Sequence, residues 1–349
     1  MDIATYEQLG FEIALGTYLL SSILFILYVS MKKERLGSMG LTLAFFGFAF
    51  ETIALANRWF YTGHPPWVTT YEVMAFFAWT LVGAYLILNF RSNYKSVGII
   101  VAPLAFIIMG FSSMQSANPE PLVPALQSVW LLIHVPIVIL AYGAFAVAFA
   151  ASALYLWKDR KLIVGTKDLQ NDQNPHDVPS SKHSQSGAGI LTGLQLDALD
   201  DIAYKSVAIG FPLLTFGIIT GAIWANRAWG SYWSWDPKET WSLVTWFVFL
   251  IYLHARTQNW SGRFAAYISV SGFLSVICTF LGVGYVLPFL ESFFSVSTGM
   301  HGYAGGDTLT GTVLFCGVLG AVIVLLLTTR KRPPKTTKAS SKDVATHAG

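Results

Sequence analysis

The chain has 349 residues, of which 54% are hydrophobic and only 12% are charged, and its mean hydropathy is +0.54. Soluble domains carry about 25% charged residues, so this composition excludes an ordinary soluble protein. The formal net charge of +3 is too small to indicate a nucleic-acid partner.

Nine apolar runs dominate the chain. A membrane-spanning helix needs about 20 mostly apolar residues to cross a hydrocarbon core of about 30 Å. The runs lie at residues 11–31, 38–59, 72–90, 96–113, 126–157, 203–225, 240–257, 264–286 and 309–329. The sequence therefore predicts an all-α fold, a polytopic membrane helix bundle with about nine transmembrane helices.

Basic residues follow every odd-numbered run. They are Lys32, Lys33 and Arg35, then Arg91 and Lys95, then Lys158, Arg160 and Lys161, then Arg256 and Arg263, and finally Arg330, Lys331 and Arg332. Because loops rich in Lys and Arg stay in the cytoplasm, we expect the N-terminus outside and the C-terminus inside. The connection after the sixth run then lies outside.

The polar segments suggest a division of the chain. Residues 158–198 are rich in Ser, Gln, Asn and Asp and are expected to form a flexible cytoplasmic loop. We expect a five-helix membrane part at 1–157, a core at 199–303, an extra C-terminal helix at 304–330 and a polar tail at 331–349.

The connection after the sixth run is unusually rich in tryptophan. Six of the twelve tryptophans lie within residues 224–246. Those of the segment 229–241, called here the Trp segment, are Trp229, Trp233, Trp235 and Trp241. One or two would be ordinary interfacial anchors. Four of them, with Asp236 and other charges between, predict a flat apolar platform with a charged rim, which suits a porphyrin.

Four histidines lie outside the polar loop and tail: His64, His134, His254 and His301. His134 and His301 are expected on the same side of the membrane as the Trp segment. Neutral imidazole is a common axial ligand of haem iron, so these two could form a bis-His site, or each could be a hydrogen-bonded packing residue. The two cysteines, Cys278 and Cys316, lie in apolar runs without a Cys-x-x-Cys pattern, which argues against thiol chemistry.

Other ionisable residues leave two interpretations open. His254 lies about 14 residues into the seventh run, or about 20 Å below the outer side, so it marks a second haem position or an unrelated polar contact. Glu51, within the second run, is a protonated structural carboxyl or part of a proton or ligand path. Glu72 is expected to be an interfacial charge. Arg227 and Lys238 could pair with haem propionates or anchor the chain at the interface.

The Trp segment resembles the tryptophan-rich WWD signature of haem-handling proteins. The sequence from Leu199-Asp-Asp to Tyr252-Leu-His-Ala-Arg256 resembles that of the CcsA/ResC family of the system II cytochrome c biogenesis pathway. Gly63-His-Pro, Tyr71-Glu72 and the stretch 122–134 also match, so the resemblance covers roughly residues 55–303.

The resemblance implies attachment of haem b to the Cys-x-x-Cys-His segment of apocytochrome c, with a CcsB/ResB-like membrane partner, as part of a cytochrome c haem lyase complex. It implies His134 and His301 as outer iron ligands and His254 as half of an inner site. The other implied haem-binding residues are Trp229, Trp233, Trp235, Asp236 and Trp241. No residue needs to act as a catalytic nucleophile.

Two departures and three alternatives accompany this interpretation. The chain has Met300-His-Gly-Tyr303 where many members have Leu-His-Ser-Tyr, and a ninth run follows where the family commonly ends. The alternatives are a system I haem-handling protein, a proton-coupled secondary transporter using Glu51 and His254, and a structural subunit of a respiratory complex. The expected location is a bacterial plasma membrane, or a thylakoid membrane in a cyanobacterium.

Overall fold

The computed structural model describes residues 3–281, except 93, 119–121, 123 and 172–181, and all regular structure in that part is helical. The helices are α1 (Ile3–Met31), α2 (Glu34–Thr62), α3 (Thr70–Ser92), η1 (Lys95–Val97), α4 (Gly98–Ser113), η2 (Pro124–Leu126), α5 (Val129–Asn171), α6 (Lys182–Trp229), α7 (Pro237–Thr257) and α8 (Arg263–Ile277). The predicted all-α class is confirmed for these residues. The expected ninth helix, 309–329, and His301 lie outside them.

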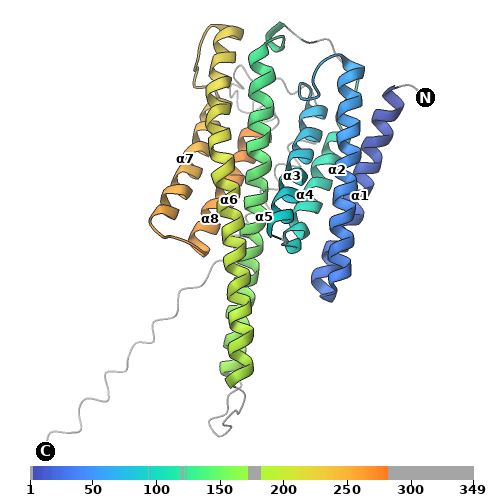
Figure 1. The fold of residues 1–349 in the computed structure, drawn as a ribbon. Helices are drawn as coiled ribbons and strands as arrows, with labels where there is room; N and C mark the ends of the chain where they lie inside the picture. The colour runs from blue at the N-terminus through green and yellow to red at the C-terminus, as the bar shows by residue number, and fades with distance from the viewer. Residues whose placement is uncertain (1–2, 93, 119–121, 123, 172–181, 282–349) are drawn as a thin grey trace, which may run out of the picture.

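Successive long helices run up and down the bundle (Figure 1). The start of α1 and the α2–α3, α4–α5 and α6–α7 connections therefore lie at one end, called here the Trp end. The α1–α2, α3–α4, α5–α6 and α7–α8 connections lie at the opposite end, called here the basic end. This alternation gathers the basic loops of the described residues at one end, as the sequence predicted.

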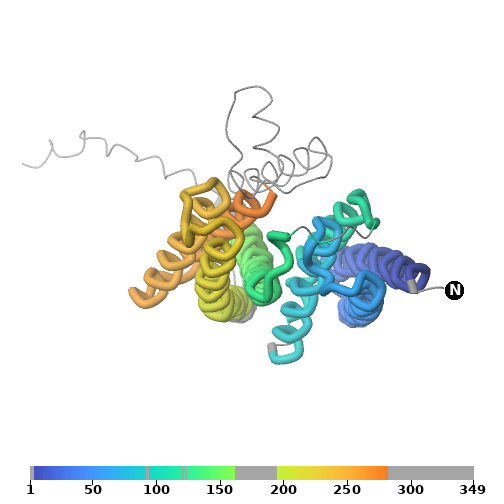
Figure 2. Tube along the Cα trace, turned by 90° about the horizontal axis from the view of Figure 1, so that it is seen from above, coloured from blue at the N-terminus to red at the C-terminus, as the bar shows by residue number. Residues whose placement is uncertain are grey.

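The helices form two groups that meet at the middle of the bundle. Seen from above, α1–α4 lie on one side and α5–α8 on the other (Figure 2). Contacts between α3 and α5 join the groups, while α1 packs chiefly on α2 and α5 chiefly on α6. At Gly143 of α5 the backbone approaches α3 so closely that an added Cβ would lie 2.7 Å from Thr80 Oγ1. Small residues permit such contacts between membrane helices.

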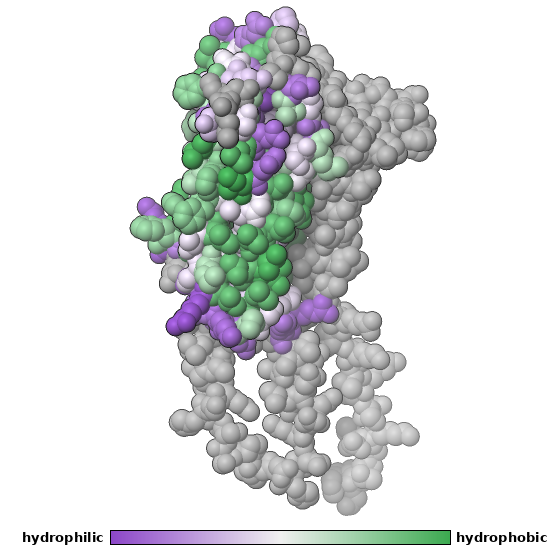
Figure 3. Space-filling view, turned by 90° about the vertical axis from the view of Figure 1, so that its right-hand side faces the viewer, coloured by the Kyte–Doolittle hydropathy of each residue, from purple (hydrophilic) through white to green (hydrophobic). Residues whose placement is uncertain are grey.

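Seven helices of the described chain are long and apolar enough to cross a membrane: α1 to α6, with η1 joined to α4, and α8. Figure 3 shows an apolar surface between hydrophilic ends on the face formed by α1 and α2. Helix α7, expected to span at 240–257, is not among the seven; it carries Lys238, Glu239 and Ser242 near its start. It still packs beside α6 and α8. The number of spans and their orientation stay predictions.

Helices α5 and α6 extend beyond their predicted limits, 126–157 and 203–225. Helix α5 continues to Asn171 and α6 begins at Lys182, so much of the expected loop 158–198 is helical. The hydropathy pattern detects residues that suit lipid, whereas polar residues also support a helix outside it. Ion pairs from Arg263 to Asp159 and from Arg256 to Asp200 fasten the α7–α8 connection to these two helices. The predicted flexibility of the loop and the five-part division stay predictions.

The contact at Gly143 yields a stability prediction. The Cβ of Gly143→Ala would meet both the side chain and the backbone of Thr80, so we expect overpacking to cost about 1–3 kcal/mol and to lower the melting temperature in detergent. Gly110→Ala is the control, because nothing lies within 4 Å of its added Cβ. Equal melting temperatures for the two variants would contradict this account of the α3–α5 contact.

The gathering of basic residues at one end yields a topology prediction. A reporter that is active only outside the cytoplasm should work when fused after Trp235 and fail when fused within 165–195 or after Arg332. Activity from either of the last two fusions would reverse or break the orientation expected from the basic loops.

Candidate functional site

Two carboxylates shape the α6–α7 connection, together with Gly230 and Trp235, whose backbones have a positive φ. Gly230, at φ +79°, ends α6 with its N–H donating to Asn226 O at 2.9 Å. Asp236 caps α7, accepting the Glu239 N–H at 2.8 Å, and Pro237 follows at the first helical position. Glu239 in turn accepts the backbone N–H of Ser234 at 2.7 Å. The sequence Asp-Pro-x-Glu thus fixes how the Trp segment enters α7.

Beneath this connection lies a cavity of about 460 Å³, within the usual size range of ligand pockets, roughly 300–1,000 Å³. Its wall is mainly apolar and comes from the α2–α3, α4–α5 and α6–α7 connections, from α3, α5 and α6, from the start of α7 and from the residues after α8. Polar side chains of the wall include His134, Lys238 and Glu239. The site therefore joins the N-terminal and C-terminal helix groups at the Trp end.

His134 of α5 is held in one orientation by α6. Its Nδ1 lies 2.7 Å from the carbonyl oxygen of Gly217. Since a carbonyl only accepts, Nδ1 carries the hydrogen, and Nε2 of the neutral ring carries the lone pair. A backbone carbonyl that fixes the second nitrogen is the usual support of a metal-ligating histidine. The ring also stacks parallel to Trp224, at 6.3 Å between centroids and 12° between planes.

Gly221 leaves the space that the imidazole occupies. A Cβ at this position would lie 2.7 Å from Cε1 and 2.8 Å from Nδ1 of His134. Gly217 and Gly221, one turn apart on α6, therefore have different roles beside His134. In the structure, the first supplies the carbonyl and the second supplies the clearance.

The tryptophans of the Trp segment do not share one environment. Trp233 lines the cavity, and its buried indole N–H has no hydrogen-bond partner among the described residues. Trp229 meets the ring of Trp224 edge-on at 4.9 Å. Trp235, at φ +61°, is 69% exposed and Trp241 is 39% exposed, and neither is among the described wall residues. The single platform predicted from the sequence is thus divided between a cavity wall and an outer surface.

Lys238 supplies positive charge to the cavity wall. Burial lowers the pKa of its ammonium group, and the nearby Asp236 carboxylate offsets part of this effect. Asp236, expected to bind haem, is buried and serves as the cap of α7. An ammonium in an apolar wall favours a ligand with an acidic group.

Two other histidines singled out in the sequence, His64 and His254, are described and are not among the wall residues of this cavity. His254 is exposed near the basic end of α7, on the same side of the helix as Phe247 and Ile251, which are 49% and 55% exposed. His64 is 9% exposed, and its Nδ1 lies 3.1 Å from Pro65 O. His301 lies outside the described residues. Of the two predicted iron ligands within the described residues, His134 and His254, only His134 lines the cavity.

Sequence reasoning missed part of the wall. Trp67 and Tyr71 come from the α2–α3 connection and the start of α3, far from the Trp segment in the chain. The family resemblance at Tyr71-Glu72 was the available signal for this part of the wall. By itself it did not show that Tyr71 lies beside the Trp segment. Trp224 was counted among the clustered tryptophans, but its stacking on His134 depends on how α5 and α6 pack.

The fold and the cavity define a helical integral membrane protein with an aromatic, histidine-bearing cavity at one end of its bundle. A family model described as cytochrome C assembly protein matches residues 67–291. The chain belongs to this family, and the resemblance predicted from the Trp segment is confirmed.

Curated relatives agree with this assignment. The relatives are named cytochrome c biogenesis protein CcsA. That of Guillardia theta is 39% identical over 249 residues, which are 69% of this chain and 81% of the relative. That of Gloeobacter violaceus is 38% identical over 68% of this chain and 81% of the relative. That of Trieres chinensis is 35% identical over 84% of this chain and 99% of the relative.

The solved structure of a cytochrome c haem lyase, CcmF, has a similar fold, with a TM-score of 0.59 at 17% identity. It covers 94% of this chain, and this chain spans 56% of that protein's length.

The clearance at Gly221 yields a prediction for the imidazole. In Gly221→Ala the added methyl group should displace the ring and weaken its bond to the Gly217 carbonyl, so ¹⁵N NMR of His134 should change from a single Nδ1–H tautomer toward a mixture. Gly210→Ala is a matched control on the same helix. Its Cβ also meets an α5 ring at 2.7 Å, but the ring is that of Phe145. Unchanged His134 shifts in Gly221→Ala would refute the positioning role.

Proposed function

We propose that this protein holds haem b in the cavity at the Trp end and presents it to apocytochrome c for attachment. The observation that carries the proposal is His134, whose Nδ1–H is fixed by Gly217 O while Nε2 keeps the lone pair that iron requires. Family membership supports a part in cytochrome c biogenesis.

The wall residues suit a flat, apolar molecule with acidic groups at its rim. Aromatic side chains supply apolar contact, Lys238 supplies a cation for a carboxylate, and the buried Trp233 N–H is a donor for which the described chain provides no acceptor. Haem b fits these properties through its macrocycle, its propionates and its iron. The apocytochrome thiols would add to the two vinyl groups of haem b.

The chain's contribution is binding and orientation. His134 would hold the iron from one side, and His301 is the proposed second ligand. The Trp segment would exclude water, and Lys238 would orient the molecule through a propionate. The cysteine thiols belong to the apocytochrome, so no side chain of this protein acts as a nucleophile. This subunit's part in the complex is to position the two reactants, haem b and apocytochrome c.

The exposed side of α7 suggests how a partner takes part. His254 lies on a face with Phe247 and Ile251, at the opposite end from the cavity opening beneath the Trp segment. We propose that a CcsB/ResB-like membrane protein covers this face and supplies a second imidazole to an inner haem position. The exposure of His254 supports this, because a histidine facing lipid alone is costly.

The test uses the absorption spectrum of the protein purified with its partner. His134→Gly should lose the bis-His signature and cytochrome c assembly, and added imidazole should restore part of both by occupying the vacated axial position. His254→Ala is the matched comparison: it should lower the haem-to-protein ratio but leave the bis-His character of the remaining haem. An unchanged spectrum in His134→Gly would remove the outer-site proposal, and an unchanged ratio in His254→Ala would remove the inner one.

A further inference from the structure

Glu51 of α2 is a buried carboxyl that the proposed function does not use. Its side chain is fully buried, and the Tyr18 hydroxyl donates to Oε2 at 2.6 Å. Within the described residues, Oε1 has no hydrogen-bond partner. The hydrogen bond from Tyr18 therefore satisfies Oε2, while Oε1 stays unsatisfied among the described residues. An unsatisfied buried oxygen is costly, so Oε1 calls for a partner that is not a described side chain.

A second buried polar atom lies two turns further along the same helix. Arg58 is 2% exposed, and its Nη2 also has no hydrogen-bond partner in the described part of the chain. Both residues line one small cavity of about 10 Å³ between α1, α2 and α3. A single water needs a volume of about 10–15 Å³ measured in this way, and polar groups to bind. Arg58 and Glu51 each bring a buried polar atom without a described partner to this cavity, whose volume is at the lower limit for one water.

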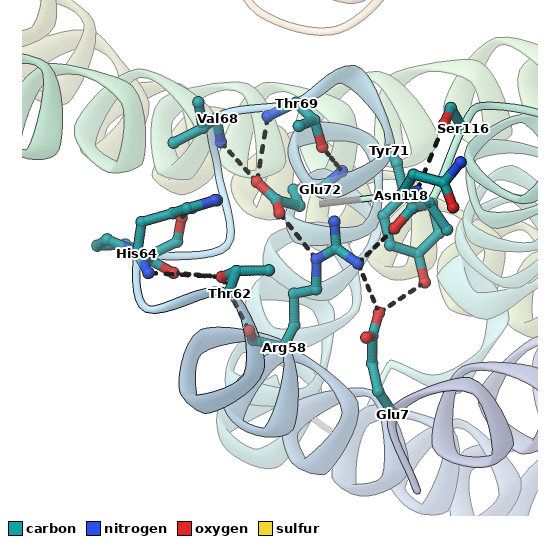
Figure 4. A network of polar contacts seen from close by, with 12 residues as sticks. Glu7, Arg58, Thr62, His64, Val68, Thr69, Tyr71, Glu72, Ser116 and Asn118 are labelled. Atoms are coloured by element: carbon teal, nitrogen blue, oxygen red, sulfur yellow. Dashed lines mark hydrogen bonds and ion pairs between the residues drawn. The ribbon is translucent and has the colours of Figure 1, made fainter. Parts of the chain in front are cut away.

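The remaining atoms of Arg58 belong to a dense polar cluster (Figure 4). Nε donates to Glu72 at 2.8 Å, and Nη1 donates to Ala117 O at 2.7 Å and to Glu7 at 3.4 Å. The Tyr71 hydroxyl donates to the same Glu7 oxygen at 3.2 Å. Glu72 is thus buried and paired, and the sequence-based expectation of an interfacial charge is wrong.

The charges of this cluster do not balance without protons. Three carboxyls, those of Glu7, Glu51 and Glu72, line the small cavity with one guanidinium. Glu72 accepts Arg58 Nε and the backbone N–H groups of Val68 and Thr69, so it is the carboxylate best stabilised as an anion. Glu7 Oε1 lies 3.4 Å from Arg58 Nη1, whereas no described cation pairs with the buried Glu51. Because an unpaired buried charge is costly, Glu51 is the carboxyl that must hold a proton.

Tyr71 connects this cluster with the large cavity. Its side chain lines both the 10 Å³ cavity and the 460 Å³ cavity, and its hydroxyl contacts Glu7. Hydrogen bonds therefore connect Arg58 and Glu7 with Tyr71 in the wall of the proposed ligand site, and Glu51 lines the same small cavity as these three residues.

We propose that the small cavity is a proton-transfer site in which one water links Glu51 to Glu7. In the transfer, the O–H bond of Glu51 breaks as its proton passes to the water. The water gives one of its own protons to the Glu7 carboxylate, and nothing is oxidised or reduced. Glu51 thus stores a proton that can move toward the large cavity when the charge of a ligand there changes. The site exists whatever that ligand is.

The first measurement is infrared spectroscopy of the full-length protein in lipid nanodiscs, without ligand. A protonated Glu51 gives a carboxyl C=O band that is present in the wild type and absent in Glu51→Gln. In D₂O this band should shift before the amides of the membrane helices exchange, because the water connects the carboxyl to the outer cavity. Absence of the band, or a shift only together with those amides, would overturn the proposal.

The second measurement fills the small cavity. Ala54 and Ala75 line it and are buried, so Ala54→Val or Ala75→Val should displace the water. The Glu51 band should persist while its early deuterium shift is lost. Ala44→Val is the control, because Ala44 is equally buried on α2 but does not line this cavity. An early shift that survives in a folded Ala54→Val or Ala75→Val protein would exclude the water link.

Tyr18→Phe separates the two oxygens of the carboxyl. It removes the hydrogen bond to Oε2 and should raise the frequency of the Glu51 band without delaying its deuterium shift. A delay equal to that of the filled-cavity variants would place the exchange route through Tyr18 and overturn the route through Glu7.

Discussion

The close approach of α5 and α6 is the constraint on which the site depends. Gly217 and Gly221 lie one turn apart on α6 and face Val138 and His134 of α5. Any larger residue at these positions would separate the helices or displace the imidazole. Since the Gly217 carbonyl then lies within hydrogen-bond distance of His134, one packing contact both builds the cavity wall and fixes the tautomer of its histidine. The Trp segment completes a site whose geometry this helix pair has already set.

Much of the fold and part of the site could be predicted from the sequence. Apolar runs of membrane length identify the helices because lipid demands them, and the basic loops predict their alternation. His134 and Trp233 could be proposed because imidazole and indole have few other reasons to gather there. The lengths of α5 and α6 could not be predicted, because a helix that continues outside the membrane leaves no signal in the hydropathy of the sequence. Nor could the exposure of Trp235, which follows from a left-handed backbone at a residue that seldom adopts one.

Two kinds of buried polar group meet in this bundle. Glu72 and Asp236 cap helices and accept defined donors, so they are fully accounted for as parts of the scaffold. Glu51, Arg58 and Trp233 each keep a buried polar atom for which the described chain offers no partner. Because membrane interiors penalise such atoms heavily, groups of this second kind indicate where a small molecule is accommodated.

The parallel stacking of His134 on Trp224 has a consequence for the direction of binding. The lone pair of an imidazole nitrogen lies in the plane of the ring, and Trp224 is tilted from that plane by only 12°. An atom that coordinates Nε2 must therefore approach along the plane of the Trp224 indole and not onto its face. Trp224 buttresses the imidazole against rotation, while contact with the broad faces of a bound molecule is left to other side chains of the cavity.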